Sequence, residues 1–246
     1  MNNPLVSIIT PSFNQAQFLE QTILSVINQT YKNIEYFVMD GGSNDGSLEI
    51  IKKYDANINY WQSKADLGQV DAINQAFKMC KGEIICFINS DDILMPNAVQ
   101  TAVTCFEINN EIGLVHGNCS TIDENGNEIK PKVGNPVKFK ELLNIGMLPS
   151  IFQPSCFFNK SQIKRDFFLD PRFNYAFDYE LILHLVKNSI SFYTNMHMAA
   201  YRIHSKAKSQ NINAAFKEKL QVQLMYMKGV NLKWVWRKLK TIFSKK

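Results

Sequence analysis

The sequence predicts an α/β protein with a mostly parallel central sheet flanked by helices. Short apolar runs alternate with amphipathic helical patterns through the first half of the chain, which is the order of a parallel sheet with right-handed crossovers. The apolar runs are nearly continuous, as is typical of strands that are buried on both faces of such a sheet. Three of these runs end abruptly in polar or acidic residues.

The individual elements follow from the spacing of apolar residues. Leu19, Ile23 and Val26 recur at helical spacing, whereas the strands are short runs of consecutive apolar residues. The expected strands are 6–10, 34–39, 58–61, 83–88, 113–116, 156–159 and 191–201. The expected helices are 16–29, 47–54, 70–80, 97–109, 137–143 and 178–187. Segment 123–127 predicts a hairpin turn, because its Asn-Gly pair suits a tight reversal.

Composition restricts the class of protein. With 246 residues and 46% hydrophobic content, the chain can bury a full core, and its 12% aromatic content argues against disorder. The five cysteines form no CxxC pair and no zinc spacing with the four histidines, so buried free thiols in a reducing compartment are expected. No signal peptide is expected, because the first apolar stretch is short and reads as a strand. No apolar stretch approaches the ~18 residues that a membrane-spanning helix needs.

The positive charge lies at the C-terminal end. After Glu218 the chain has eight basic residues and no acidic one, so the net charge of +5 becomes −3 for residues 1–218. A slightly acidic body argues against a nucleic-acid-binding protein. The tail combines an apolar helical stripe with a basic face, which favours membrane-surface binding; a helix packed on the body is the alternative. The stripe consists of Leu232, Val235, Trp236, Leu239, Ile242 and Phe243.

Acidic and amide side chains follow the predicted strands. In open α/β sheets, ligands bind beyond the carboxyl ends of the strands, where this sequence places Asn14, Asp40, Asp45, Asp91 and Asp92. Carboxylates on one rim repel each other, and a divalent cation or a polar ligand would offset that repulsion. For the last pair the alternative is a turn in which one Asp caps the next helix, but a cap needs only one carboxylate.

The turn 40–47 is rich in glycine, acidic and hydroxyl residues. Glycine permits positive φ and a close approach of the backbone to a ligand. The turn has no Lys, and the chain has neither a P-loop nor a GxGxxG pattern. Acidic turn groups suit the hydroxyls and ring nitrogens of a nucleoside better than its phosphates. An ordinary turn between strand and helix is the alternative.

Three segments farther along the chain have two interpretations each. Asn74 shares a helix face with an acidic residue, either for ligand binding or as a solvated face. Asp178 begins a helix with apolar residues at helical spacing. It either caps this helix or acts as a general base. Arg202 and His204 point to one face of the last strand, where the histidine is either structural or a contact to metal or phosphate. The small, cationic segment 205–209 suits a lid over an anionic leaving group.

These segments, in this order, resemble the family 2 glycosyltransferases with the GT-A fold, particularly bacterial enzymes of surface-polysaccharide synthesis. The resemblance covers roughly residues 5–205. It is carried by Ser7-Ile8-Ile9-Thr10-Pro11-Ser12-Phe13-Asn14, Asp40 through Ser47, Gly68 through Asn74, Asn89-Ser90-Asp91-Asp92, Gln153-Pro154-Ser155, Asp178-Tyr179-Glu180-Leu181 and Tyr201-Arg202-Ile203-His204. It implies a GT-A domain over 1–218, with a nucleotide-sugar-binding half (1–116) and an acceptor and catalytic-base half (117–218), followed by the tail 219–246.

The resemblance also implies roles for single residues. Asp91 looks like the metal-binding carboxylate of the family's DxD motif, for Mn²⁺ or Mg²⁺, with His204 and Asp92 as further candidate ligands. Asp178 is similar to the family's catalytic base. The residues implied in binding the nucleotide-sugar, usually a UDP-sugar, are Thr10, Pro11, Ser12, Asn14, Asp40, Gly41, Ser43, Asp45, Gly68, Gln69, Asn74, Asn89, Ser90 and Arg202.

Two positions depart from the family's pattern. Asn89 stands where the first Asp of DxD is expected, so a bound ion would depend more on Asp91. The pair that the family writes Glu-Asp is Phe177-Asp178, which keeps the carboxylate expected to act as the base.

The implied function is metal-dependent, inverting transfer of a sugar from a nucleotide-sugar to a hydroxyl of a glycan or lipid-linked acceptor. The expected location is the cytoplasm, with peripheral association at the inner membrane face, and no nucleic-acid partner is expected. One alternative is a non-catalytic nucleotide-sugar-binding subunit of a synthase complex, suggested by Asn89. The other is a nucleotidyltransferase of related architecture, which would release pyrophosphate. Acceptor recognition is expected in 134–154 and beside Asp178; the sequence predicts neither the donor sugar nor the oligomeric state.

Overall fold

The computed structural model describes residues 3–144 and 150–227. Within them, nine strands form one sheet: β1 (Val6–Ser12), β2 (Ile34–Asp40), β3 (Tyr60–Ser63), β4 (Ile84–Phe87), β5 (Ile93–Leu94), β6 (Ile112–Ile122), β7 (Glu128–Lys132), β8 (Cys156–Asn159) and β9 (Ile190–Arg202). Their order is β3-β2-β1-β4-β8-β6-β9-β5, with β7 paired to β6. The pairs β1–β2, β2–β3, β1–β4 and β6–β9 are parallel. The predicted mostly parallel sheet is therefore confirmed.

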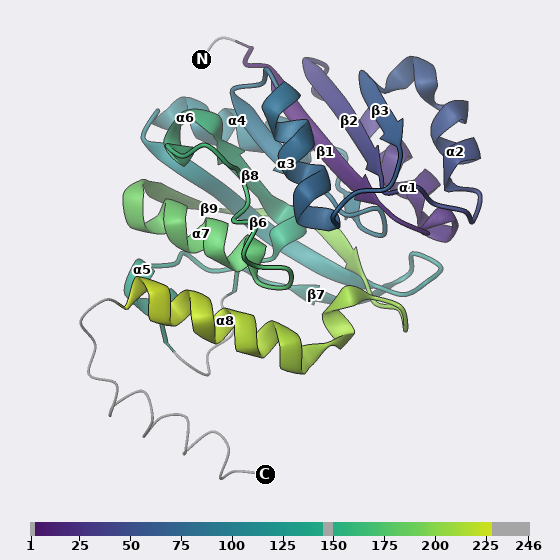
Figure 1. The fold of residues 1–246 in the computed structure, drawn as a ribbon. Helices are drawn as coiled ribbons and strands as arrows, with labels where there is room; N and C mark the ends of the chain where they lie inside the picture. The colour runs from purple at the N-terminus through teal and green to yellow at the C-terminus, as the bar shows by residue number, and fades with distance from the viewer. Residues whose placement is uncertain (1–2, 145–149, 228–246) are drawn as a thin grey trace.

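Helices cover both faces of this sheet (Figure 1). They are α1 (Ala16–Ile27), α2 (Ser47–Lys53), α3 (Gln69–Met79), α4 (Ala98–Ile108), α5 (Phe139–Leu142), α6 (Lys160–Ile163), α7 (Phe177–Asn188) and α8 (Ile212–Tyr226). Three short 3₁₀ turns lie at Asp55–Asn57, Gln153–Ser155 and Lys208–Gln210.

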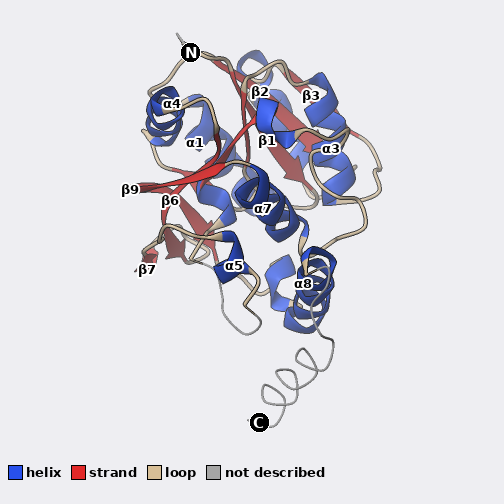
Figure 2. Cartoon of the chain, turned by 90° about the vertical axis from the view of Figure 1, so that its left-hand side faces the viewer, coloured by secondary structure: helices blue, strands red, loops and turns tan. Residues whose placement is uncertain are grey.

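Two hydrophobic clusters separate the layers. One cluster joins α1, α2 and α4 to one face of the sheet and includes Ile8 and Leu19. The other joins α3, α7 and α8 to the opposite face and includes Ile9 and Leu181. Figure 2 shows α1 and α4 on one side of the strands and α3 and α7 on the other. The alternation of Ile8 and Ile9 between the clusters is the period-2 pattern of a strand buried on both faces.

The sheet changes direction at β8. This strand is antiparallel to both of its neighbours, pairing Ile85 with Phe158 of β8 and Phe158 with Leu114 of β6. The sequence predicted β8 and its bounds but not this position between β4 and β6. Parallel strands need a long crossover connection, whereas an antiparallel insertion needs only a segment that returns across the sheet.

One strand is much longer than expected. The apolar run predicts a strand only over 113–116, but β6 continues to Ile122. Register shifts against β9 occur on both sides of Asn118, and a Cβ at Gly117 would lie 2.4 Å from the Met198 side chain. These irregular pairings interrupt the apolar pattern without ending the strand. Beyond them, the predicted turn at 123–127 is confirmed and joins β6 to β7.

The helix α8 was not predicted from the sequence, and it crosses residue 218. Its residue Val222 is fully buried, and Gln223 donates hydrogen bonds to Leu142 O (3.3 Å) and to Tyr179 Oη (3.1 Å). The described part of the expected tail therefore packs beside α5 and α7. The predicted amphipathic helix at 232–243 lies outside the described residues.

All five cysteines are buried and free, as predicted. No helix in the described part of the chain has the length and apolar character needed to span a bilayer.

Candidate active site

The carboxyl ends of β1, β2 and β4 meet at one edge of the sheet (Figure 1). Ser12 at the end of β1 pairs with Asp40 at the end of β2, and Ile9 pairs with Phe87 at the end of β4. The acidic segment 89–92 begins two residues after Phe87. The structure thus brings together the polar strand ends that the sequence predicted to converge.

Asp40 is a buried anchor of its own turn. Its side chain is fully buried, and Oδ2 accepts hydrogen bonds from Gly42 N (3.1 Å), Ser43 N (2.9 Å) and Ser63 Oγ (2.6 Å). The Ser43 hydroxyl donates to Oδ1. These four donors occupy most of the accepting capacity of the carboxylate. Asp40 therefore shapes the turn more directly than it offers a free oxygen to a ligand.

A second set of contacts joins this turn to the start of α1. Asn14 has a positive φ of 51°, and its N–H donates to Ser43 Oγ at 2.8 Å. Asp45 accepts from Ala16 N at 2.9 Å and from the Ser47 N–H and hydroxyl. Partial burial alone would raise the pKa of Asp45, but the donors Ser47 and Ala16 outweigh it and hold the pKa below its ordinary value. Both predicted residues thus fix the loop around the strand ends.

The last residues of β1 differ in what they offer. Thr10 is buried and accepts a hydrogen bond from the Tyr36 hydroxyl at 3.0 Å, and Pro11 is buried beside it. The buried Ser12 Oγ has no hydrogen-bond partner among the described residues. Phe13, which the sequence analysis did not single out, is 61% exposed. An exposed aromatic ring at a polar strand end is a stacking surface, and its position beside Asn14 could have revealed it.

Two glycines permit close packing at this edge. A Cβ at Gly41 would lie 3.2 Å from Asp66 Oδ2 and 3.3 Å from the Phe13 ring. Gly68 has a φ of 103°, which favours glycine, and its N–H donates to Asp66 Oδ1 at 2.7 Å. Gly68 thereby turns the chain into α3, whose first residue is Gln69.

A chain of amide hydrogen bonds links α3 to the acidic segment. Gln69 Nε2 donates to Asn89 Oδ1 at 2.7 Å, and Asn89 Nδ2 donates to Asp92 Oδ2 at 3.0 Å. Asp92 is buried, and its Oδ1 accepts from Arg202 N at 3.0 Å. Burial, together with the Asp91 charge, raises the pKa of Asp92 well above its ordinary value. Ser90, inside this segment, is also buried.

Asp91 faces a histidine rather than these amides. Its Oδ2 lies 2.9 Å from His204 Nε2, and its side chain is 18% exposed. The buried His204 ring packs on Phe18 with a centroid separation of 4.8 Å. No described residue donates a hydrogen bond to Asp91 Oδ1, and the side chain is partly exposed.

Asp91 and His204 fit a divalent cation whose remaining ligands come from the substrate and from water. No three His, Cys, Asp or Glu side chains in the described ranges are grouped as a complete metal site. Mg²⁺ is usually held by one or two protein carboxylates plus substrate phosphates and water. Two protein side chains are therefore enough to form such a site. Asp91 and His204 would hold such an ion. Both carboxylate oxygens of Asp92 already accept hydrogen bonds, from Asn89 and from Arg202 N.

Asp178 lies in the first turn of α7. It accepts a hydrogen bond from Tyr179 N at 2.7 Å through Oδ1, and no described residue donates to Oδ2. Burial raises the pKa of Asp178, while the Tyr179 N–H and the charges of Lys208 and Lys219 oppose the rise. The side chain before it, Phe177, is buried against Phe87.

Lys208 bridges the two halves of the site. Its Nζ lies 3.1 Å from Gln69 Oε1 and 2.8 Å from Asn174 Oδ1, and it sits 5.3 Å from the centre of the Phe177 ring. Through Lys208, Gln69 and Asn89, polar contacts run from the start of α7 to the acidic segment. Lys208 belongs to the segment 205–209 that the sequence predicted to lie over the leaving group.

Two predicted donor-binding residues have other partners. Asn74 Nδ2 donates to Leu169 O at 2.8 Å, and its Oδ1 accepts from Phe168 N and Leu169 N. The guanidinium of Arg202 contacts main-chain carbonyls and Gln21. Both side chains thus bind the protein itself.

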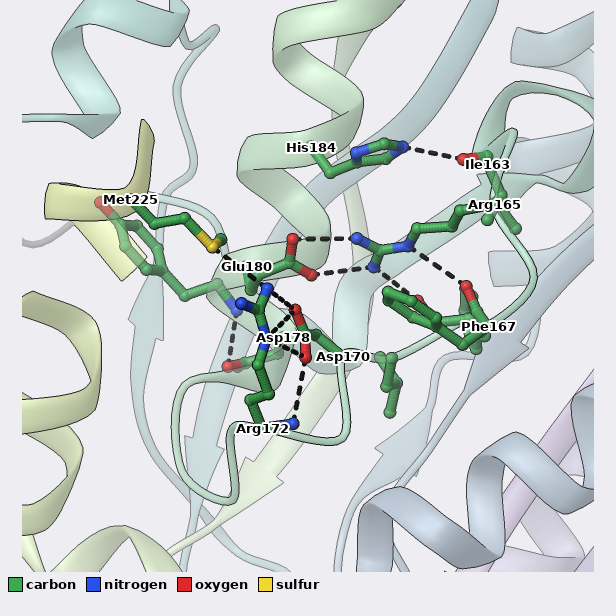
Figure 3. Close-up of polar contacts among 12 residues, drawn as sticks. Ile163, Arg165, Phe167, Asp170, Arg172, Asp178, Glu180, His184 and Met225 are labelled. Atoms are coloured by element: carbon green, nitrogen blue, oxygen red, sulfur yellow. Dashed lines mark hydrogen bonds and ion pairs between the residues drawn. The ribbon is translucent and has the colours of Figure 1, made fainter. Parts of the chain in front are cut away.

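Glu180, two residues after Asp178 on α7, belongs to a second polar cluster (Figure 3). Glu180 pairs with both terminal nitrogens of Arg165 at 2.9 and 2.8 Å and accepts from the Tyr226 hydroxyl at 2.8 Å. A pocket of about 290 Å³ lies beside these residues. Two residues along a helix differ by about 200° in direction, so this cluster does not share a face with Asp178.

Residues 7–167, more than half of the chain, match the family model described as Glycosyl transferase family 2. A relative from Rickettsia bellii, named an uncharacterized glycosyltransferase, is 30% identical over 223 residues, which cover 86% of this chain and 31% of the relative. A relative from Haemophilus influenzae with the same kind of name is 36% identical over 133 residues, 53% of each chain. The chain thus spans about a third and about half of the length of these relatives.

Solved structures share the fold. S. aureus TarS 1–349 in complex with UDP-GlcNAc matches with a TM-score of 0.69 at 16% identity, over 84% of this chain and 61% of that one. The mannosyltransferase PcManGT from Pyrobaculum calidifontis, in complex with GDP-Man and Mn²⁺, matches with a TM-score of 0.66 at 15% identity, over 89% and 64%. The mostly parallel, helix-covered sheet is therefore of the GT-A type. Because the family model matches more than half of the chain, and that match includes the ends of β1, β2 and β4, the chain belongs to glycosyltransferase family 2.

Proposed function

We propose that the protein is a metal-dependent, inverting glycosyltransferase that moves a sugar from a nucleotide-sugar to a hydroxyl of a glycan or lipid-linked glycan acceptor. One observation carries the proposal: Asp91 and Asp178 each have a carboxylate oxygen without a described hydrogen-bond donor. Contacts through Asn89, Gln69 and Lys208 connect the acidic segment to the start of α7. The complexes of TarS with UDP-GlcNAc and of PcManGT with GDP-Man and Mn²⁺ support a nucleotide-sugar donor, for which we expect UDP.

We assign the nucleoside to the ends of β1 and β2. The exposed ring of Phe13 would stack on the base, and the unpaired Ser12 Oγ would hydrogen-bond a donor group. Asp40, Ser43 and Asn14 would hold the surrounding turn in shape. The buried hydroxyl without a partner supports this assignment, because a ligand there would satisfy it.

The proposed reaction requires a base and a stabilised leaving group. Asp178 Oδ2 would take the proton of the acceptor hydroxyl, whose oxygen then attacks the anomeric carbon from the face opposite the diphosphate. The bond to the diphosphate breaks through an oxocarbenium-like state, and the configuration inverts. A Mn²⁺ or Mg²⁺ ion at Asp91 and His204 would supply positive charge to the leaving group. Lys208, which contacts Gln69 and Asn174, would add a second positive charge.

The electrostatic setting of Asp178 suits a base. Burial raises its pKa from the ordinary value of an aspartate, which makes the carboxylate more basic. The same raised pKa lowers the stability of the fold. As the pH rises from the pKa of the unfolded chain to the higher pKa of the folded state, ionisation of this carboxyl favours unfolding. Replacing Asp178 by a neutral amide is therefore expected to preserve or increase stability.

Asn89 is compatible with catalysis. The alternative of a non-catalytic binding subunit rests on the missing first Asp of DxD, but the Asn89 amide donates to the buried Asp92 carboxylate. A carboxylate at position 89 could not donate this bond and would add a third negative charge beside Asp91 and Asp92. The neutral residue is thus explained by its partner rather than by loss of function.

The first experiment is a mass-spectrometric screen of UDP-sugars and other activated sugars with Mn²⁺ or Mg²⁺. We expect slow donor hydrolysis with release of UDP, and its loss on addition of EDTA. Binding of the nucleotide without any hydrolysis or transfer would favour the binding subunit. Release of pyrophosphate from a nucleoside triphosphate would favour the nucleotidyltransferase.

A second prediction concerns Asn89→Asp. Although this change restores the family's motif, we expect it to lower turnover about tenfold or more, because it replaces a donor to Asp92 by a like charge. Asn89→Ala is the matched comparison, since it removes the hydrogen bond without adding charge. A rise in turnover for Asn89→Asp would contradict the assigned role of Asp92.

A third prediction concerns Asp178→Asn. We expect turnover to fall by about 10²-fold or more while nucleotide affinity stays nearly unchanged, because the variant loses a base that contacts only the acceptor. Thermal unfolding should show an equal or higher Tm. The exposed Asp166→Asn serves as the control. Near-normal turnover in Asp178→Asn would remove this residue from the mechanism.

A fourth prediction concerns the tail. We propose that the part of the tail beyond α8 holds the protein at the cytoplasmic face of the membrane, because each basic residue near an anionic lipid surface contributes about 1 kcal/mol of attraction. Deleting 232–246 removes six Lys or Arg residues and should reduce cosedimentation with phosphatidylglycerol vesicles more than about tenfold. Phosphatidylcholine vesicles are the comparison. Unchanged partition after the deletion would refute the proposal.

A further inference from the structure

Arg202 ends β9 and is only 2% exposed, although it carries a positive charge. Its Nε donates to Asp91 O at 2.9 Å, and its Nη1 donates to Asp123 O at 2.9 Å and Glu124 O at 3.1 Å. Its Nη2 donates to Gln21 Oε1 at 2.7 Å. Four of the five N–H groups of a guanidinium are therefore directed to protein oxygens. One N–H remains, so a bidentate contact to a phosphate would displace at least one of these hydrogen bonds.

The main chain of Arg202 also hydrogen-bonds to the acidic segment. Its N–H donates to Asp92 Oδ1 at 3.0 Å, so one residue contacts both members of the acidic pair. Its guanidinium also lies over the Phe18 ring, 4.8 Å from the centre. The His204 ring packs on the same phenylalanine at 4.8 Å.

These contacts gather the surroundings of Asp91 from four parts of the chain. Gln21 belongs to α1, the acidic pair follows β4, Asp123 follows β6, and Arg202 ends β9. His204 comes two residues later and reaches Asp91 Oδ2 at 2.9 Å. The relative placement of Asp91 and His204 thus depends on where Arg202 holds the two segments.

The charge of Arg202 also has a role at this place. Asp91 and Asp92 are adjacent carboxylates in a mostly buried setting, and like charges there repel each other strongly. The guanidinium compensates them without an ion pair to either carboxylate, because its own hydrogen bonds go to carbonyl and amide oxygens. Both carboxylates consequently keep their oxygens for other partners.

We propose that Arg202 is a positioning residue that sets the geometry of Asp91 and His204 for a divalent cation, and that it is not itself a ligand of the diphosphate. This inference rests on the proposed function. It assigns a new role to a residue that the sequence analysis placed among the donor contacts. Residues of this kind, which orient metal ligands, typically change metal affinity or activity by about 10–100-fold when altered.

Lysine cannot replace Arg202 in this role. A lysine has one nitrogen with three donors on a flexible stem, whereas the planar guanidinium reaches Asp91 O, Asp123 O and Gln21 in different directions. Arg202→Lys therefore keeps the charge but loses the geometry.

The test measures binding separately from turnover in the full-length chain. UDP affinity is measured by calorimetry in EDTA, and Mn²⁺ affinity by electron paramagnetic resonance at saturating UDP. For Arg202→Lys we expect the UDP affinity in EDTA to stay within about twofold, while the Mn²⁺ affinity falls by about tenfold or more. If Arg202 instead bound the diphosphate directly, Arg202→Lys would weaken UDP binding even in EDTA. That result would overturn the proposal.

Arg165→Lys is the matched control, because Arg165 is a largely buried arginine, with a 12% exposed side chain, and has both carboxylate and carbonyl partners away from the acidic segment (Figure 3). It should lose stability but keep its Mn²⁺ affinity. Gln21→Ala provides a variant at an exposed side chain that removes one partner of Arg202. If Arg202→Lys does not fold, Gln21→Ala decides: a lower Mn²⁺ affinity at unchanged UDP affinity supports the proposal, and an unchanged Mn²⁺ affinity overturns it.

The two levels of inference can fail separately. If the wild-type protein turns over a nucleotide-sugar and binds Mn²⁺, but Arg202→Lys behaves like Arg165→Lys, only the role of Arg202 is refuted. If the wild-type protein binds neither UDP nor Mn²⁺, the proposed function is refuted and the role of Arg202 with it.

Discussion

The structure depends on how like charges are tolerated at one edge of a sheet. Parallel strands end together, so acidic residues that follow them are forced close to each other. The protein neutralises most of these carboxylates with hydrogen-bond donors from its own chain. Asp40 accepts from the hydroxyls of Ser43 and Ser63 and from two backbone N–H groups, and Asp92 accepts from Asn89 and Arg202 N. Each of these groups is fixed in the scaffold.

The remaining carboxylates are distinguished by what they lack. Asp91 and Asp178 each have one oxygen to which no described residue donates a hydrogen bond. A buried or half-buried carboxylate oxygen is costly unless it has a partner, so an open oxygen at a ligand edge is where a cation or a substrate hydroxyl is favoured. Whether a carboxylate already has its hydrogen-bond donors therefore distinguishes structural residues from candidate functional ones. The presence of an acidic residue alone does not make this distinction.

Much of the architecture could be predicted from local patterns, because strands buried on both faces have nearly continuous apolar runs. What could not be predicted depends on distant partners. The length of β6 follows from bulged pairing with β9, and α8 has no strong apolar stripe of its own. In the site, Asp40 and Asp91 have similar sequence settings, yet the donors that distinguish them include Ser63 and His204. Phe13 was overlooked because an isolated aromatic residue carries no periodic signal.

The two departures from the family's pattern have one physical effect. Asn89 and Phe177 both stand where an acidic residue is expected, and both have partners that a carboxylate would not suit. Asn89 donates to Asp92, and Phe177 packs on Phe87 with ring centres 6.1 Å apart. Each neutral residue lowers the repulsion at the edge while leaving one carboxylate with an open oxygen beside it. The chain thus keeps the two groups that its proposed chemistry requires and removes the acidic neighbours that would have to be compensated.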